Sequence, residues 1–190
     1  DLQAQKDSVK KMMFYPPNVD AETGLMDSAS LANARIYTNI GVALKNKDRV
    51  HKFQLAYLDD LRKIPDELFS LDKIQVLELR FLPKLEEIPS AIAKLRNLEQ
   101  LYVNGTAIIT IPKEISDLPR LKVLNLSQNK IGKLPTELGN CKSLEHLALF
   151  ANNLYVLPPE MANLSKLKSL EVHDNKLSIL SKGVCKIKSL

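Results

Sequence analysis

Apolar residues recur along most of the chain with a period of 23 or 24 positions. A Leu or Ile followed by Pro marks each period, and six units begin at Val50, Ile74, Leu98, Leu121, Leu144 and Leu167. The pair stands at Ile64, Ile88, Ile111, Leu134 and Leu157, and Leu180 takes the same place without its proline. Such a period, kept over six units, indicates a solenoid in which each unit buries its apolar face against its neighbours.

Each unit has two halves with different periods. In the first half apolar residues alternate, as Leu124 and Leu126 do, which predicts a short strand with one buried face. In the second half apolar residues lie three apart behind a proline such as Pro135, which predicts a helical turn that the proline opens. We expect parallel strands centred on residues 53–55, 77–79, 101–103, 124–126, 147–149 and 170–172.

The clearest unit is LKVLNLSQNKIGKLPTELGNCKS, residues 121–143. It resembles the leucine-rich repeat family in the 23-residue form LxxLxLxxNxLxxLPxxLxxLxx, and the resemblance covers residues 50–190. It implies an α/β fold: a horseshoe-shaped solenoid with parallel strands on the concave face and short helical turns on the convex face. It also implies an asparagine ladder, in which buried amides bond to backbone groups that lack ladder partners. The residues in the ladder place are Thr106, Asn129, Asn152 and Asn175, while the first two units carry Leu58 and Leu82 there.

Residues 1–49 contain no repeat. We divide them into a partly irregular leader over residues 1–27 and an N-terminal helical cap over residues 28–49. A helix is expected from about residue 28 to 47, with Asp27 or Ser28 as N-cap, because a solenoid needs a terminal unit that covers its first coil. Residues 1–15 either pack there, are disordered or form a separate interaction arm.

Composition and charge exclude several classes of protein. The chain is 45% hydrophobic and 26% charged, and no run of about 18 apolar residues exists, which argues against membrane insertion. The net charge of +5 comes from interspersed acidic and basic residues, so we expect no binding of nucleic acid. The chain starts with Asp rather than Met, and its repeats resemble those of bacterial surface or secreted proteins as well as Ras-suppressor and Scribble-like scaffolds. We therefore favour an extracytoplasmic location, with a cytoplasmic one as the alternative.

No catalytic constellation is visible. His51, His146 and His173 lie in different units and are interpreted as solvated surface side chains, although His146 and His173 could meet across adjacent coils. No short-spaced pair of metal ligands and no Gly-rich phosphate loop occurs, so we expect no metal, no cofactor and no enzyme activity. Cys141 stands at an apolar position of the convex turn and is expected to be a small buried hydrophobe.

The strand positions that point away from the core carry a candidate binding surface. Four of the ten Phe and Tyr residues fall there, and aromatic residues bring large contact area with few rotatable bonds. The predicted protein-binding residues are Tyr57, Arg80, Phe81, Tyr102, Asn104, Asn125, His146, Phe150 and His173. Phe81 and Tyr102 are expected to be close neighbours across the second and third strands.

Two functions fit this surface. The first is a non-catalytic protein-protein recognition module that binds a protein ligand on its concave face. The alternative is a targeting arm of a larger enzyme or receptor whose catalytic part lies outside this chain. A glycan receptor is a third reading, weakened by the absence of Trp.

The last coil generates a prediction of its own, since Leu190 begins a seventh unit that the sequence does not complete. An unfinished edge leaves strand groups unpaired and apolar side chains uncovered, so we expect further chain, an end-to-end homodimer through the C-terminal coil, or a frayed last unit. Analytical ultracentrifugation and hydrogen exchange measure this. A strict monomer at high concentration, with residues 175–190 as protected as the middle coils, would contradict it.

Overall fold

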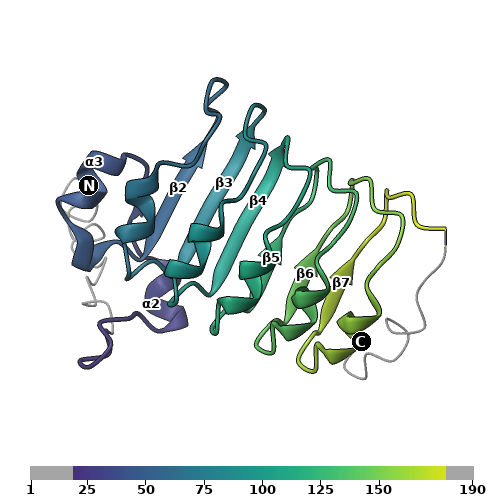
Figure 1. Cartoon of the computed structure of the whole chain (residues 1–190). Coiled ribbons are helices and arrows are strands. Elements are labelled where there is room, and N and C mark those ends of the chain that lie inside the picture. Colours follow the sequence, from purple (N-terminus) through teal and green to yellow (C-terminus); the bar gives the residue numbers. More distant parts are fainter. Residues whose placement is uncertain (1–18, 179–190) are drawn as a thin grey trace, which may run out of the picture.

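The computed structural model describes residues 19–178, which form one open sheet of seven parallel strands in sequence order (Figure 1). The strands are β1 (Ile36–Tyr37), β2 (Lys52–Ala56), β3 (Val76–Leu82), β4 (Gln100–Thr106), β5 (Val123–Asn125), β6 (His146–Ala148) and β7 (Ser169–Glu171). All six strands expected from the repeat are present and parallel, which confirms the predicted fold. The sequence pattern missed β1, which pairs with β2 ahead of the first repeat.

A five-residue 3-10 helix follows each of the first five repeat strands on the other side of the coil. These helices are η2 (Asp66–Ser70), η3 (Ser90–Lys94), η4 (Lys113–Asp117), η5 (Thr136–Asn140) and η6 (Pro159–Asn163). Each proline that follows the Leu or Ile of the repeat is the N-cap of its helix, so the helix begins one residue after the proline and not at it, as the sequence pattern had predicted. Its carbonyl accepts the N–H of the apolar residue three positions on, as Pro135 does from Leu138 at 3.2 Å, so each turn closes around a fully buried side chain.

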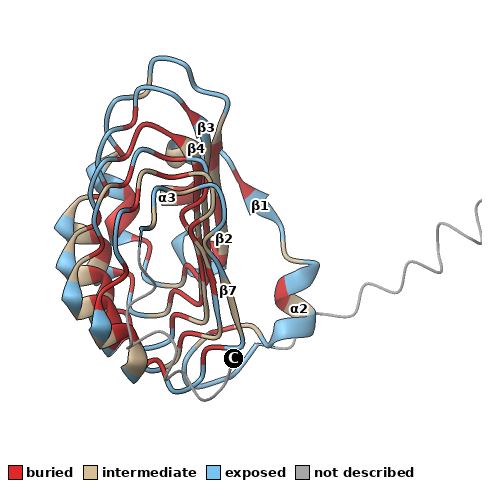
Figure 2. Cartoon of the chain, turned by 90° about the vertical axis from the view of Figure 1, so that its right-hand side faces the viewer, coloured by how far each residue is buried: buried red, intermediate tan, exposed pale blue. Residues whose placement is uncertain are grey.

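The core fills the space between the strands and the 3-10 helices (Figure 2). Leucines of successive strands stand in register, as Leu77, Leu101, Leu124 and Leu147 do, and none of these four is more than 1% exposed. Neither half of a coil encloses these side chains by itself. Apolar burial of about 25 cal/mol per Å² therefore accumulates only as coils stack.

Asparagine amides satisfy the backbone where the coil turns inside the core. Asn152 Nδ2 donates to the carbonyls of Leu126 (2.8 Å) and Leu149 (3.0 Å), and its Oδ1 accepts the N–H of Ile131 at 3.0 Å. Asn129 and Asn175 make equivalent bonds in their own coils, and the Thr106 hydroxyl donates to Asn129 Oδ1. Each amide bridges two adjacent coils and holds their spacing.

The single helix expected from residue 28 to 47 is wrong. The segment forms two five-residue helices, α2 (Ser28–Ala32) and α3 (Ile40–Leu44), with β1 between them and the 3-10 helix η1 (Lys47–Arg49) after them. Asp27 is the N-cap of α2, as one of the two predicted candidates, and Asn39 caps α3. Residues 36–37 form a strand and not part of a helix because β1 pairs with the otherwise open edge of β2, and this tertiary contact outweighs the local helix preference.

The segment before β1 lies across the beginnings of the first strands. Figure 2 shows α2 on the opposite side of the sheet from the 3-10 helices. Lys52 Nζ donates to the carbonyl of Ala32 at 3.0 Å, and Val76 is buried although its strand position points away from the core. The segment therefore covers the strand-start edge and leaves the strand-end half of that face open. Phe14 and Tyr15 lie outside the described residues.

We predict that Asn152→Ala lowers the free energy of unfolding by about 3 kcal/mol, because it leaves several buried backbone groups without partners. Chemical denaturation measures the change. The neighbouring Asn153 provides the control, since no side-chain hydrogen bond of this residue occurs within residues 19–178, and Asn153→Ala should change stability by no more than about 0.5 kcal/mol. Equal losses in both variants would contradict the structural role of the Asn152 amide.

Candidate functional site

The strand residues that alternate with the core form columns on the open side of the sheet, which we call the open face. Register places Gln54, Glu78, Tyr102, Asn125, Ala148 and Glu171 in one column. A second column starts at Ala56, Arg80 and Asn104, and the repeat continues it through Ser127, Phe150 and His173. Side chains of neighbouring units in a column are about 4.8 Å apart, so residues far apart in sequence share one surface.

Polar contacts hold Arg80 in place on this face. Its Nε lies 3.0 Å from Glu78 Oε2, which also accepts from Gln54 Nε2 at 2.7 Å, and its guanidinium stands 4.8 Å from the ring centroid of Tyr102. The Tyr102 hydroxyl donates to Gln100 Oε1 at 3.1 Å, and burial raises the pKa of this phenol. The contacts fix Arg80 and Tyr102 before any ligand arrives, so binding would cost little side-chain entropy.

Two aromatic rings form an exposed pair at the ends of β2 and β3. Tyr57 and Phe81 stack with centroids 5.0 Å apart and planes at 17°, yet they are 74% and 42% exposed. A Cβ on Gly105 would lie 2.8 Å from Phe81 Cδ1, so the Phe81 ring occupies the room that a larger residue at 105 would need. The three residues make a platform on three successive coils.

The residue that directly follows the second column in the sequence has a positive φ in every repeat. These residues are Tyr57, Phe81, Gly105, Gln128, Ala151 and Asp174, with φ between 52° and 67°. A left-handed conformation costs a residue with a side chain about 1 kcal/mol, and only Gly105 avoids that cost. The turn therefore projects the Tyr57 and Phe81 rings from a conformation that the solenoid imposes.

A second aromatic pair lies four coils further along. Phe150 and His173 stack with centroids 4.9 Å apart and planes at 8°, and His173 Nδ1 lies 3.0 Å from Asp174 Oδ2. Asn104, Ser127 and Gln128 separate this pair from the first one. Asn104 Oδ1 is buried and has no hydrogen-bond partner among residues 19–178, while Asn125 Oδ1 accepts from the N–H of Ser127 at 3.0 Å.

The structure groups the predicted residues differently from the expectation in two places. Phe81 stacks on Tyr57 and Tyr102 packs under Arg80, because Phe81 stands beyond the column that holds Tyr102. His146 pairs in register with Ser169, outside the column of His173, so these two histidines do not form a pair. Glu78 and Gly105 were not assigned to the site. Two features of the sequence could have identified them. These are the opposite charges of Glu78 and Arg80, two positions apart, and a single Gly at a repeat position that larger residues occupy in the other units.

His51 is a correction, since it is buried rather than on the surface. It is 2% exposed, and its Nδ1 lies 3.1 Å from Gln75 Oε1. The Gln75 amide also holds the backbone of Met26, accepting its N–H and donating to its carbonyl at 2.8 Å each. Because Gln75 Oε1 only accepts, His51 Nδ1 must carry a proton and donate. Burial lowers the pKa of His51.

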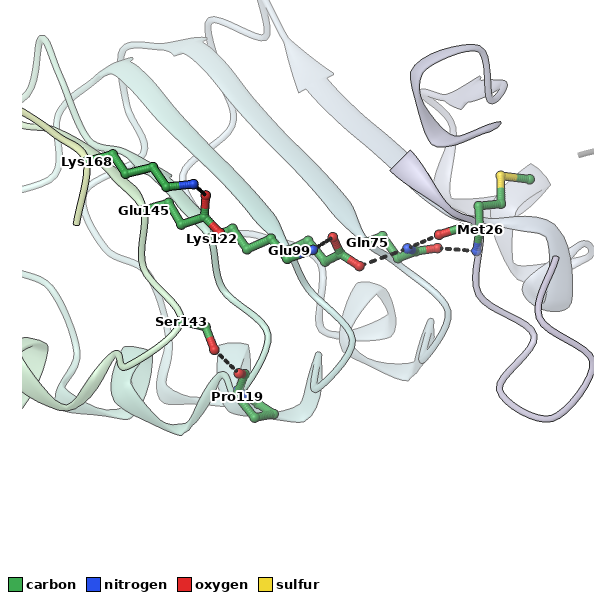
Figure 3. Close-up of polar contacts among 8 residues, drawn as sticks. All are labelled: Met26, Gln75, Glu99, Pro119, Lys122, Ser143, Glu145 and Lys168. Atoms are coloured by element: carbon green, nitrogen blue, oxygen red, sulfur yellow. Dashed lines mark hydrogen bonds and ion pairs between the residues drawn. The ribbon is translucent and has the colours of Figure 1, made fainter. Parts of the chain in front are cut away.

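Gln75, which contacts His51, begins a row of polar side chains across the solenoid (Figure 3). Gln75 Nε2 donates to Glu99 Oε1 at 3.2 Å, Glu99 Oε2 pairs with Lys122 at 2.7 Å, and Lys168 pairs with Glu145 at 2.6 Å. Lys168 lowers the pKa of Glu145. The row attaches the N-terminal segment to the repeats and leaves the open face free.

The other groups with possible chemical roles are a cysteine and potential metal ligands. Cys141 is buried, and burial raises the pKa of its thiol to about 11, so it is an unreactive thiol at neutral pH; Cys185 lies outside the described residues. Within residues 19–178, no group of three or more His, Cys, Asp and Glu side chains is placed to hold a metal ion. Over the same range, no helix combines the length and apolar character needed to span a membrane.

A shallow cleft lies where the N-terminal segment meets the third repeat. It encloses about 390 Å³, and its polar lining includes Asp20, Asp27, Glu99 and Arg120. Glu99 is already bonded to Gln75 and Lys122. The cleft is thus a packing gap beside the polar row, away from both aromatic pairs.

Comparison with known proteins agrees with this architecture. Residues 110–154 match the family model described as leucine rich repeat, and no curated protein matches the chain. A solved leucine-rich repeat protein of Leptospira interrogans is 24% identical with a TM-score of 0.57, over 82% of this chain and 57% of that one. The plant peptide hormone receptor RGFR1 in complex with RGF2 is 26% identical with a TM-score of 0.64, over 83% of this chain and 26% of the receptor.

A plant ice-binding protein is 27% identical with a TM-score of 0.61, over 70% of this chain and 44% of that protein. The chain thus spans little more than half the length of the Leptospira protein and about a quarter of the receptor. It carries leucine-rich repeats, and its described part is a leucine-rich repeat solenoid.

We predict that stability falls as the pH drops below about 6.5, the ordinary pKa of histidine, because the unfolded chain then binds a proton that buried His51 resists. The lowered carboxyl pKa values of Asp20 and Glu145 act only below their ordinary values of 3.8 and 4.5. Urea denaturation between pH 7.5 and 5.5 should show the loss in the parent protein and less of it in His51→Gln. The exposed His146 is the control, and a His146→Gln variant with the same reduced pH dependence would contradict the assignment.

Proposed function

We propose that this chain is a non-catalytic protein-recognition module that binds a protein ligand on the strand-end half of the open face. The observation that carries the proposal is the Tyr57–Phe81 pair, stacked, exposed and supported by Gly105. Two neighbouring aromatic rings left in water are unfavourable without a partner, and interfaces favour such side chains. The predicted site residues Arg80, Tyr102, Asn104, Asn125 and Phe150 lie on the same face, and His146 and His173 are at its C-terminal end.

The similarity to a plant peptide hormone receptor in complex with RGF2 supports a protein or peptide as the ligand class. Arg80 adds a second argument. It is held by Glu78 and Tyr102 and is half-buried, which are the properties of a preformed contact. The absence of a metal-binding cluster among residues 19–178 is compatible with recognition alone.

A second candidate is the targeting arm of a larger enzyme or receptor. Recognition through the open face is common to both candidates, which differ in what the rest of the protein does. An extracytoplasmic location and an end-to-end homodimer remain predictions from the sequence.

We predict that a Phe81→Ala, Tyr102→Ala double variant loses at least about 2 kcal/mol of binding free energy for the natural partner. Neither side chain belongs to the apolar core, so thermal stability should change little. A pull-down with the parent and the variant, followed by titration of the captured protein, measures the loss. Lys113→Glu and Lys133→Glu, at exposed positions on the convex half of the coil, are the controls and should bind as the parent does. Equal capture by the double variant would place the site elsewhere.

A further inference from the structure

The open face carries two aromatic pairs rather than one continuous apolar surface. Resting on the proposed function, we infer that the partner presents an extended peptide segment with two apolar side chains four residues apart. One packs against Phe81, the inner ring of the Tyr57–Phe81 pair, and the other against Phe150, the inner ring of the Phe150–His173 pair. The segment runs across the strands, along the solenoid.

The distance between the Phe81 and Phe150 rings determines the spacing of the two apolar side chains of the peptide. Phe81 belongs to the second repeat and Phe150 to the fifth, so three strand spacings of about 4.8 Å separate them by about 14 Å. An extended chain rises about 3.3 Å per residue, so four residues span that distance. Side chains of an extended chain alternate, and positions i and i+4 therefore point to the same side and reach both pairs together.

The surface between the pairs suits the residue in the middle of such a segment. Along the two columns that hold Phe81 and Phe150, the intervening residues are Asn104, Gly105, Ser127 and Gln128. Asn104 and Ser127 are buried, Gly105 has no side chain and Gln128 is exposed. We expect a small or polar residue at i+2.

The C-terminal end of the open face is acidic. In the first two repeats Arg80 is paired with Glu78, whereas Glu171 and Asp174 give −2 in the sixth repeat. The Glu171 carboxylate has no hydrogen bond or ion pair within the described residues, and no Asp, Glu, Lys or Arg stands on the open face of the third to fifth repeats. Complementary charge favours a peptide with a basic residue near the second apolar anchor.

The test begins with a library of random eleven-residue peptides displayed on phage and selected on the full chain. Enriched sequences should carry two apolar residues four apart, with a basic residue beside one of them. A synthetic peptide of that sequence should lose at least tenfold in affinity when one residue is deleted between the anchors, because one anchor then points away from the surface.

Double-mutant cycles assign each anchor to its pair. Phe81→Ala and Phe150→Ala should each weaken binding of the parent peptide at least tenfold. Alanine at one anchor of the peptide should abolish the effect of one protein substitution and leave the other intact. Tyr155→Ala is the matched control: this tyrosine is 57% exposed but outside the open face, so its loss should change affinity less than twofold. Circular dichroism confirms that each variant is folded.

Three outcomes would overturn the inference, and they bear differently on the proposed function. If the selected peptides depend on Phe81 and Phe150 but show no fixed spacing, recognition by the open face stands and the two-anchor segment falls. If they bind the Phe81→Ala and Phe150→Ala variants as the parent, the inference fails and the pull-down decides the proposed function. If no peptide is enriched, the partner is not an extended segment, and a folded protein ligand still fits the proposed function.

Discussion

Each coil of this protein buries its apolar side chains only against the coils on either side of it, because a strand and a 3-10 helix have no closed interior of their own. The leucine columns through β2 to β6 and the amide bridges of Asn129 and Asn152 are the two forms of this contact, one apolar and one polar. The amides matter because a coil that turns inside a core exposes carbonyl groups to an apolar environment, where an unpaired group is costly. Lateral stacking therefore determines strand spacing, and strand spacing determines everything that is built on the sheet.

The open face takes its order from this stacking. Since the register is the same between successive strands, an outward residue in one repeat stands beside its equivalent in the next. The outward residues of neighbouring repeats therefore contact each other. Tyr57 on Phe81 and Phe150 on His173 are contacts of this kind, between residues 24 and 23 positions apart, and Arg80 over Tyr102 is a diagonal contact between the two columns. The same arrangement allows the interior to stay nearly uniform while the face varies. Recognition then requires no change in the core.

The N-terminal segment solves a different problem with different means. It adds β1 to the edge of β2 and fastens its backbone through the Gln75 amide and the Lys52 ammonium. These contacts lie at the strand-start side, so they end the sheet without covering the aromatic pairs. The buried His51 ring belongs to this attachment through its contact with Gln75, whereas the exposed His173 belongs to the face. The two histidines thus have unrelated roles.

The sequence by itself determined the repeats, the parallel strands, the buried leucines and the side chains of the open face, because each of these follows from a period that stacking repeats. It also placed Arg80 and Phe150 on the open face, since alternation along a strand decides which side a residue takes. Tyr57 and Phe81 directly follow outward residues, so the left-handed turn decided their side. Only the tertiary structure decided that Phe81 pairs with Tyr57 rather than Tyr102, because that choice depends on the left-handed turn and on the space above Gly105. It alone decided that residues 28–47 break around β1 and that His51 is buried. Both outcomes depend on groups distant in sequence, the edge of β2 and the amide of Gln75, which no local pattern contains.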